Sequence, residues 1–236
     1  MTGTLRYEQV LPNATYAPWA ADADFQAAFA DIREHTLVDH FRCYELWQLI
    51  EQTAHLPGDI LEVGVWRGGT GCLMARRVQM LGSQAKVVLC DTFSGVVKAG
   101  AKDGAYRGGE HADTSLDIVN DLASRMGLAN VETLIGIFPE ETGERIADRR
   151  FALCHIDVDV YQSGLDVLEW VWPRMPVGGV VVYDDYGFAT CDGITRLVNE
   201  RYVQRGAVTL HNLNGHAVVI KTNDDPKPLW KRLLGG

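Results

Sequence analysis

The stretch DILEVGVWRGGT, residues 59–70, decides the fold that we predict for this chain. It begins as a short apolar run typical of a buried strand, and residues 70–82 have the apolar spacing of a helix. Glycine lets a backbone approach a ligand closely, and a helix N-terminus offers unpaired N–H groups. We therefore predict a ligand-binding turn between a strand and a helix, with Gly64, Gly68 and Thr70 as binding residues. A tight turn that simply needs glycine is the structural alternative.

Short apolar runs continue to alternate with helical patterns after this turn, which is typical of βαβ units. The predicted strands are 59–64, 86–91, 131–136, 151–157, 178–185, 207–210 and 216–221, and the predicted helices between them are 70–82, 114–127, 139–148, 162–174 and 190–204. A short Asn/Gly connection joins the last two strands and predicts an antiparallel hairpin at one sheet edge. We expect an α/β fold with a doubly wound, mostly parallel, seven-stranded sheet.

The chain divides into three predicted parts. Residues 1–58 contain two helical patterns, which either form a cap that helps to close a site or serve to cover the sheet edge or pair subunits. Residues 59–223 form the main domain, and its glycine-rich insertion 94–112 is expected to be a mobile lid rather than a passive surface loop. Residues 224–236 are predicted to be a surface tail.

Composition excludes several classes of protein. The 236 residues carry 22 Lys and Arg against 31 Asp and Glu, so the formal net charge is −9 and we expect neither nucleic acid nor a membrane surface as a partner. No apolar run approaches the roughly 18 residues of a membrane span, and the N-terminus lacks a signal-peptide pattern. The five cysteines include no C-x-x-C pair, so neither a zinc ribbon nor a disulfide framework is indicated. We expect a soluble, cytoplasmic protein.

Two acidic residues at strand ends predict the cofactor. Glu62 precedes the first glycine of the turn by two positions, where a carboxylate suits a cationic group and would repel a pyrophosphate. The ammonium of an amino acid is such a group, so the turn fits S-adenosylmethionine. Asp91 closes the second strand, where an acidic side chain can accept both hydroxyls of a ribose. A capping role is the structural alternative for Asp91.

Four further residues are predicted to lie beside the adenosine. Thr92 and Phe93 follow Asp91, and Phe93 is expected to lie along the adenosine. Gly136 and Ile137, at the end of the third strand, are expected beside the adenine on topology alone.

Four aspartates end the two strands that we expect to be neighbours: Asp157, Asp159, Asp184 and Asp185. Two like charges about 4 Å apart repel by roughly 4 kcal/mol at an effective dielectric constant near 20, so the cluster needs protons or a cation. Carboxylates with water suit a hard divalent ion, and Mg²⁺ leads, with Mn²⁺ or Ca²⁺ as alternatives. Helix capping by some of these aspartates is the structural alternative.

A metal at this position predicts a base nearby. If Asp157, Asp184 and Asp185 hold the ion, Asp159 is the nearest candidate for a general base. His155 is the second candidate, although a histidine inside an apolar strand is more often a core residue. The two histidines of the edge hairpin, His211 and His216, are interpreted as structural.

Four motifs in order, EVGVWRGGT, CDTF, HIDVDVY and GGVVVYDDYG, resemble the macrocin O-methyltransferase family over roughly residues 36–221. The resemblance implies a class I methyltransferase (Rossmann-like) fold, S-adenosylmethionine as the methyl donor and metal-dependent methylation of a sugar. It also implies that Asp157, Asp184 and Asp185 are the metal ligands and that Asp159 is the base used by some members. Other members have a histidine where this chain has Val160, so a histidine base cannot act from that position. The lysine of catechol-type enzymes is also absent there, which disfavours a catechol substrate.

The leading hypothesis is therefore an O-methyltransferase that acts on a sugar hydroxyl. The acceptor is expected to be a glycosylated natural product, or an oligosaccharide or polysaccharide such as a methylated mannose polysaccharide, and the protein is expected to be a homodimer. An NAD-dependent oxidoreductase or epimerase is one alternative, and the missing G-x-G-x-x-G pattern counts against it. A catalytically silent binding module is the other, and the acidic cluster counts against it.

Overall fold

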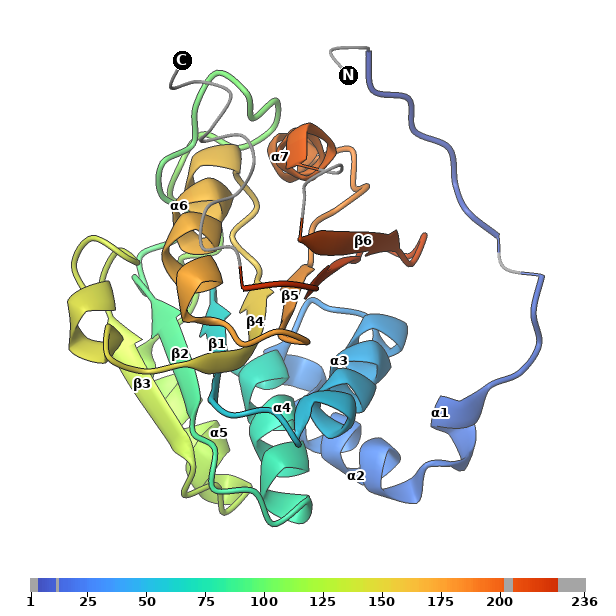
Figure 1. The fold of residues 1–236 in the computed structure, drawn as a ribbon, viewed down its shortest axis with the longest axis vertical. Coiled ribbons are helices and arrows are strands. Elements are labelled where there is room, and N and C mark those ends of the chain that lie inside the picture. The colour runs from blue at the N-terminus through green and yellow to red at the C-terminus, as the bar shows by residue number, and fades with distance from the viewer. Residues whose placement is uncertain (1–3, 12, 202–205, 225–236) are drawn as a thin grey trace.

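The computed structural model describes residues 4–11, 13–201 and 206–224. These residues form one seven-stranded sheet with the strand order β3-β2-β1-β4-β5-β7-β6 (Figure 1). The strands are β1 (Asp59–Val63), β2 (Val87–Asp91), β3 (Val131–Ile135), β4 (Phe151–Ile156), β5 (Val180–Tyr183), β6 (Ala207–His211) and β7 (Ala217–Lys221). The first five are parallel, and β7 is antiparallel to both β5 and β6. The predicted fold class and the edge hairpin are confirmed.

The helices follow the prediction with one exception. They are α1 (Pro18–Ala21), α2 (Ala23–Ile32), α3 (His40–Thr53), α4 (Gly69–Met80), α5 (Leu116–Arg125), α6 (Tyr161–Val171) and α7 (Asp192–Arg201), with 3₁₀ turns η1 (Arg33–His35), η2 (Gly143–Ile146) and η3 (Trp172–Arg174). The helix predicted over 139–148 is wrong, because only η2 forms there. Pro139 and Gly143 both disfavour a helix interior, and a Cβ on Gly143 would lie 2.8 Å from the Trp170 ring nitrogen.

Helices cover both faces of the sheet (Figure 1). Successive side chains of a strand point to opposite faces, so Ile60 of β1 joins the core beneath α2 to α5, and its neighbour Leu61 joins the core beneath α6 and α7. Phe25 of α2 and Trp47 of α3 are fully buried in the first of these cores. The N-terminal helices therefore share their core with the sheet that they cover.

Among the described residues, no helix combines the length and the apolar character that a membrane span requires. The end of the predicted helix 190–204 and the predicted tail 224–236 fall largely outside the described residues.

Candidate active site

A cavity of about 260 Å³ lies at the carboxyl ends of the parallel strands. Its walls come from the loops after β1, β2, β4 and β5, from the segment before α3 and from the insertion 94–112. The sheet order reverses between β1 and β4, where β1 continues to β2 on one side and β4 to β5 on the other. Ligands of doubly wound sheets bind at this switch point, so the cavity is the candidate active site.

The glycine turn brings the backbone of β1 against the end of β4. Gly64 has φ 86°, and a Cβ there would lie 1.7 Å from the backbone oxygen of Asp157. Gly64 and Thr70 line the cavity. Gly68 does not line the cavity. It precedes α4 with φ 85°, and a Cβ there would lie 3.0 Å from the Val119 side chain. Gly68 is therefore a turn glycine, as the structural alternative supposed.

Asp91 lines the cavity but also fastens the turn. Its Oδ2 accepts hydrogen bonds from Val65 N (2.6 Å) and Trp66 N (2.9 Å), and its Oδ1 accepts one from Phe93 N (2.7 Å). A carboxylate offers about four acceptor positions, so this arrangement leaves capacity for a ribose hydroxyl. Thr92 and Gly136 also line the cavity.

Three residues predicted to contact the cofactor lie outside the cavity lining. Glu62 is fully buried on the sheet face beneath α4, where its Oε1 lies 2.9 Å from His155 Nδ1. The strand alternation turns its carboxylate into the layer of helices rather than toward the strand end. Phe93, at φ 52°, packs on the core beneath α2 to α5, and Ile137 donates its backbone N–H to Glu141 (2.7 Å). The cavity lining thus gives no support to a cofactor contact by these three residues.

The four aspartates do converge, and all of them line the cavity. Asp157, Asp184 and Asp185 each offer a carboxylate oxygen, and these oxygens lie within 4.8 Å of one another. Asp159 stands beside them with φ 65°, and its backbone N–H donates to Asp185 Oδ2 (2.8 Å). A carboxylate oxygen of Asp159 also groups with ligand atoms of Asp185 and Cys191 within 4.8 Å, so the division into three metal ligands and one base stays a prediction.

Burial sets the proton affinity of two of these carboxyls. It raises the pKa of Asp157 well above its usual range, and the charges of Asp184 and Asp185 add to the effect. Burial and the charges of Asp159 and Asp184 raise the pKa of Asp185 in the same way. Such a pair favours either protons or a cation between the carboxyls.

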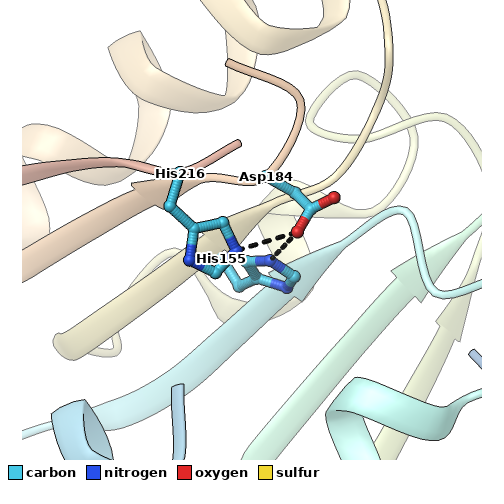
Figure 2. Close-up of side chains that lie close together, drawn as sticks. All are labelled: His155, Asp184 and His216. Atoms are coloured by element: carbon cyan, nitrogen blue, oxygen red, sulfur yellow. Dashed lines mark hydrogen bonds and ion pairs between the residues drawn. The ribbon is translucent and has the colours of Figure 1, made fainter. Parts of the chain in front are cut away.

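Asp184 is the exception in this cluster. Burial alone would raise its pKa, but contacts with His155 and His216 and the charge of Arg42 outweigh burial and lower the pKa well below its usual range. Figure 2 shows both imidazoles aimed at one oxygen of Asp184, and the Nε2–Oδ1 distances are 2.8 Å from His216 and 3.6 Å from His155. Arg42 contacts the other oxygen. Asp184 is therefore held ionised.

The donor set fits a hard divalent cation. Three carboxylates supply only oxygen, which is the ligand type that Mg²⁺, Mn²⁺ and Ca²⁺ prefer. Within the described parts of the chain, the ion pairs include Asp184 but neither Asp157 nor Asp185. Asp157 and Asp185 therefore need protons or a cation to share the site with the ionised Asp184.

His155 is not placed to act as a base. It is fully buried and lies outside the cavity lining, although a base must come within hydrogen-bond reach of the substrate. Burial lowers its pKa, but contacts with Asp184 and Glu62 outweigh burial and raise it to about 10, so the ring already carries its proton at neutral pH. His155 therefore lies in the sheet core beside Asp184. This position matches the alternative interpretation of His155 as a core residue.

Two residues of this site are absent from the sequence-based prediction. Arg42 comes from α3, and His216, which was interpreted as structural, precedes β7. The register Tyr183↔Ala217 of β5 and β7 places His216 next to Asp184, and this pairing carries no local sequence signal. The sequence offers one indication for Arg42, namely that a positively charged residue lies on the apolar face of a predicted helix.

The insertion 94–112 packs over the cavity and contributes Tyr106 and His111 to its wall. Asp103 of this segment is buried, and its Oδ1 accepts the backbone N–H of Tyr161 (2.8 Å) at the start of α6. Lys98 of the same segment forms ion pairs with Glu140 (2.5 Å) and Asp166 (2.8 Å). The segment therefore borders the cavity, and its role as a mobile lid stays a prediction.

Comparisons with known proteins agree with this geometry. The sequence model of the macrocin O-methyltransferase family (TylF) matches residues 12–218. The chain is 33% identical over 180 residues, 71% of its length, to a Streptomyces olivaceus enzyme named 8-demethyl-8-(2,3-dimethoxy-alpha-L-rhamnosyl)-tetracenomycin-C 4'-O-methyltransferase, covering 69% of that protein. It is also 33% identical over 172 residues, 66% of its length, to the mycinamicin III 3''-O-methyltransferase of Micromonospora griseorubida, covering 67% of that protein.

A solved structure shows the same fold. The O-methyltransferase NovP superposes with a TM-score of 0.68 at 25% sequence identity, over 80% of this chain and 83% of that chain. The family match spans most of the chain and includes the four motifs that carry the resemblance. By sequence and by fold, this chain belongs to the macrocin O-methyltransferase family and is an O-methyltransferase.

Proposed function

We propose that this protein transfers a methyl group from S-adenosylmethionine to a sugar hydroxyl, with Mg²⁺ in the site. One observation carries the proposal: three carboxylates gather in a cavity that also contains Asp159 and the glycine turn. The names of two relatives support a sugar acceptor, because they describe a 4'-O-methyltransferase and a 3''-O-methyltransferase of glycosylated compounds.

The donor belongs on the β1–β2 side of the cavity. Gly64 and Thr70 border the turn, where backbone can approach the methionine part closely. Asp91, Thr92 and Gly136 border the strand ends, where the ribose and adenine are expected. This assignment omits Glu62, Gly68, Phe93 and Ile137, which lie outside the lining.

Asp157, Asp184 and Asp185 would hold the divalent cation, which supplies positive charge that lowers the pKa of a neighbouring hydroxyl. Asp159 would accept the proton of the acceptor hydroxyl, because it lies beside the three ligands and faces the same cavity. The cavity walls would hold the donor and the acceptor in orientation for the transfer.

The cavity mouth favours a glycosylated natural product over a purely polar polysaccharide. Leu37 and Phe188 line this end of the cavity and are 64% and 39% exposed. Exposed apolar side chains beside a site suit an acceptor with an apolar portion next to its sugar. We also propose that the protein is cytoplasmic and forms a homodimer. Light scattering of the purified protein measures its oligomeric state.

Calorimetric titration of metal-stripped protein with S-adenosylhomocysteine, with and without Mg²⁺, tests the proposal. We expect micromolar binding, followed by Mg²⁺-dependent methyl transfer to a panel of rhamnosides and related glycosides. Transfer at the full rate in the presence of a chelator would refute the metal assignment. Absence of S-adenosylhomocysteine binding in both conditions would refute the donor assignment.

A further inference from the structure

Asp184 differs from the other proposed ligands in the number of side chains that hold it. Its Oδ1 lies 2.8 Å from His216 Nε2, and its Oδ2 contacts a guanidinium nitrogen of Arg42. Both partners are buried, with exposed fractions of 0% for His216 and 6% for Arg42. Both also come from outside the β5–α7 loop that carries Asp184.

The His216 ring is fixed at both ends. Its Nδ1 lies 2.5 Å from Oε2 of Glu45 in α3, and Asn212 Nδ2 donates to the same oxygen (2.9 Å). Each ring nitrogen of His216 thus lies at hydrogen-bond distance from a carboxylate oxygen, one of Glu45 and one of Asp184. Glu45 therefore orients the ring, and the ring in turn orients the carboxylate of Asp184.

Arg42 is fixed in a similar way. Its Nε donates to Asp39 Oδ2 (2.8 Å), while Oδ1 of the same carboxylate caps the first turn of α3. The guanidinium carbon of Arg42 lies 4.8 Å from the centre of the Phe188 ring. The planar fork leaves the NH1 group aimed at Asp184. The helix α3 thus supplies a rigid cation on one side of the carboxylate, and the hairpin supplies an imidazole on the other.

We propose that Arg42 and His216, with Glu45 behind His216, are positioning residues that fix the Asp184 carboxylate for metal binding. The proposal rests on the proposed function, because it takes Asp184 as a metal ligand. Hydrogen-bonded partners behind a metal ligand set its orientation, and their loss typically costs about 10-fold to 100-fold in metal affinity. Neither Asp157 nor Asp185 has an ion-pair partner of this kind among the described residues.

A transition-metal site made of His155, His216 and Asp184 is the competing explanation, because their ligand atoms also lie within 4.8 Å of one another. The distance of 2.8 Å between His216 Nε2 and Asp184 Oδ1 is that of a direct hydrogen bond. A tetrahedral ion about 2.1 Å from each atom would hold them roughly 3.4 Å apart. Arg42 on the same carboxylate also disfavours a second cation there.

The test compares Mg²⁺ affinity in full-length, metal-stripped variants by calorimetry. His216→Leu removes the donor and is expected to weaken Mg²⁺ binding about 10-fold to 100-fold. His216→Gln, which can present an amide N–H at the position of Nε2, is expected to recover much of that loss. His211→Leu is the matched control, because His211 lies in the same hairpin but faces the Tyr186 hydroxyl (3.2 Å), and it should bind Mg²⁺ as the wild type does. The affinity for S-adenosylhomocysteine should stay within about twofold throughout.

The outcomes separate this inference from the proposed function. If the wild type binds no Mg²⁺, the proposed metal dependence fails. If the wild type binds it and a folded His216→Leu variant binds it equally well, only the positioning role fails. If His216→Leu does not fold, the Arg42→Lys variant takes its place, because it keeps the positive charge but loses the planar guanidinium. Unchanged Mg²⁺ affinity in Arg42→Lys would overturn the inference. Tight Zn²⁺ binding that His155→Asn removes and Asp157→Asn retains would overturn it in favour of the transition-metal site.

Discussion

Individual carboxylates in the cavity have different proposed roles, and substitution separates a ligand from a base. Asp157→Asn keeps the shape but removes one of the three gathered negative charges. We expect Mg²⁺ affinity and methyl transfer to fall together, by about 100-fold or more. Binding of S-adenosylhomocysteine should persist, as measured by calorimetry. Asp117→Asn on the exposed side of α5 is the control and should leave all three quantities unchanged.

Asp159→Asn is expected to behave differently. Because Asp159 is the proposed base, its loss should lower kcat by about 100-fold to 10,000-fold, the usual range for a general base. Mg²⁺ affinity and KM for the acceptor should change by less than about threefold. Steady-state kinetics alongside Mg²⁺ titration check this split. A parallel loss of metal affinity would make Asp159 a ligand instead.

Gly64 shows how one backbone position sets the site. Gly64→Ala would place a Cβ 1.7 Å from the Asp157 oxygen at φ 86°, whereas Gly82→Ala has φ 67° with no heavy atom within 4 Å of its Cβ. The control should lose only the roughly 1–2 kcal/mol that a left-handed conformation costs. Gly64→Ala should lose clearly more, because the backbone must also shift. Chemical denaturation of both variants measures the difference, and equal losses would contradict the clash.

At the scale of elements, the insertion 94–112 supplies the cap of a distant helix. Val160 precedes α6 and makes no side-chain cap, while Asp103 accepts from the Tyr161 N–H instead. Asp103→Ala should therefore cost about 0.5–2 kcal/mol, as loss of a helix cap does, and should expose 94–112 to proteases. Denaturation and limited proteolysis measure both effects. Asp113→Ala, in an exposed ion pair with Arg67, is the control and should cost less stability than Asp103→Ala.

The N-terminal helices also act at this scale. They bury Phe25 and Trp47 against the sheet, and α3 brings Arg42 to the cavity. The helix α3 thus packs on the sheet and also borders the cavity, while closure of the site or of the sheet edge by these helices stays a prediction. Their use in pairing subunits stays a prediction.

At the scale of the whole molecule, the acidic cluster couples metal binding to stability. A ligand that binds only the folded state at about 100 times its Kd stabilises that state by about 2.7 kcal/mol. For a chain of this size such a gain raises the Tm by roughly 5–10 °C. We expect saturating Mg²⁺ to produce this rise in metal-stripped protein and Asp157→Asn to abolish it. A rise of equal size in the variant would show that Mg²⁺ acts elsewhere.

Local patterns in the sequence determined the strands, the glycine turn and the Asp184–Asp185 pair. Apolar runs, helical spacing and glycine positions act over a few residues, and parallel strands must present their carboxyl ends at one edge. The mostly parallel sheet, the edge hairpin and the convergence of four aspartates could be predicted for that reason.

Only the tertiary structure decided what surrounds those aspartates. The positions of His216 and Arg42 beside Asp184 depend on the β5–β7 register and on the packing of α3, which join residues 32 and 142 positions apart. The burial of Glu62 against His155 likewise depends on which face of β1 the helices cover. These contacts have no short-range pattern, because their geometry is set by how the helical layers close on the sheet.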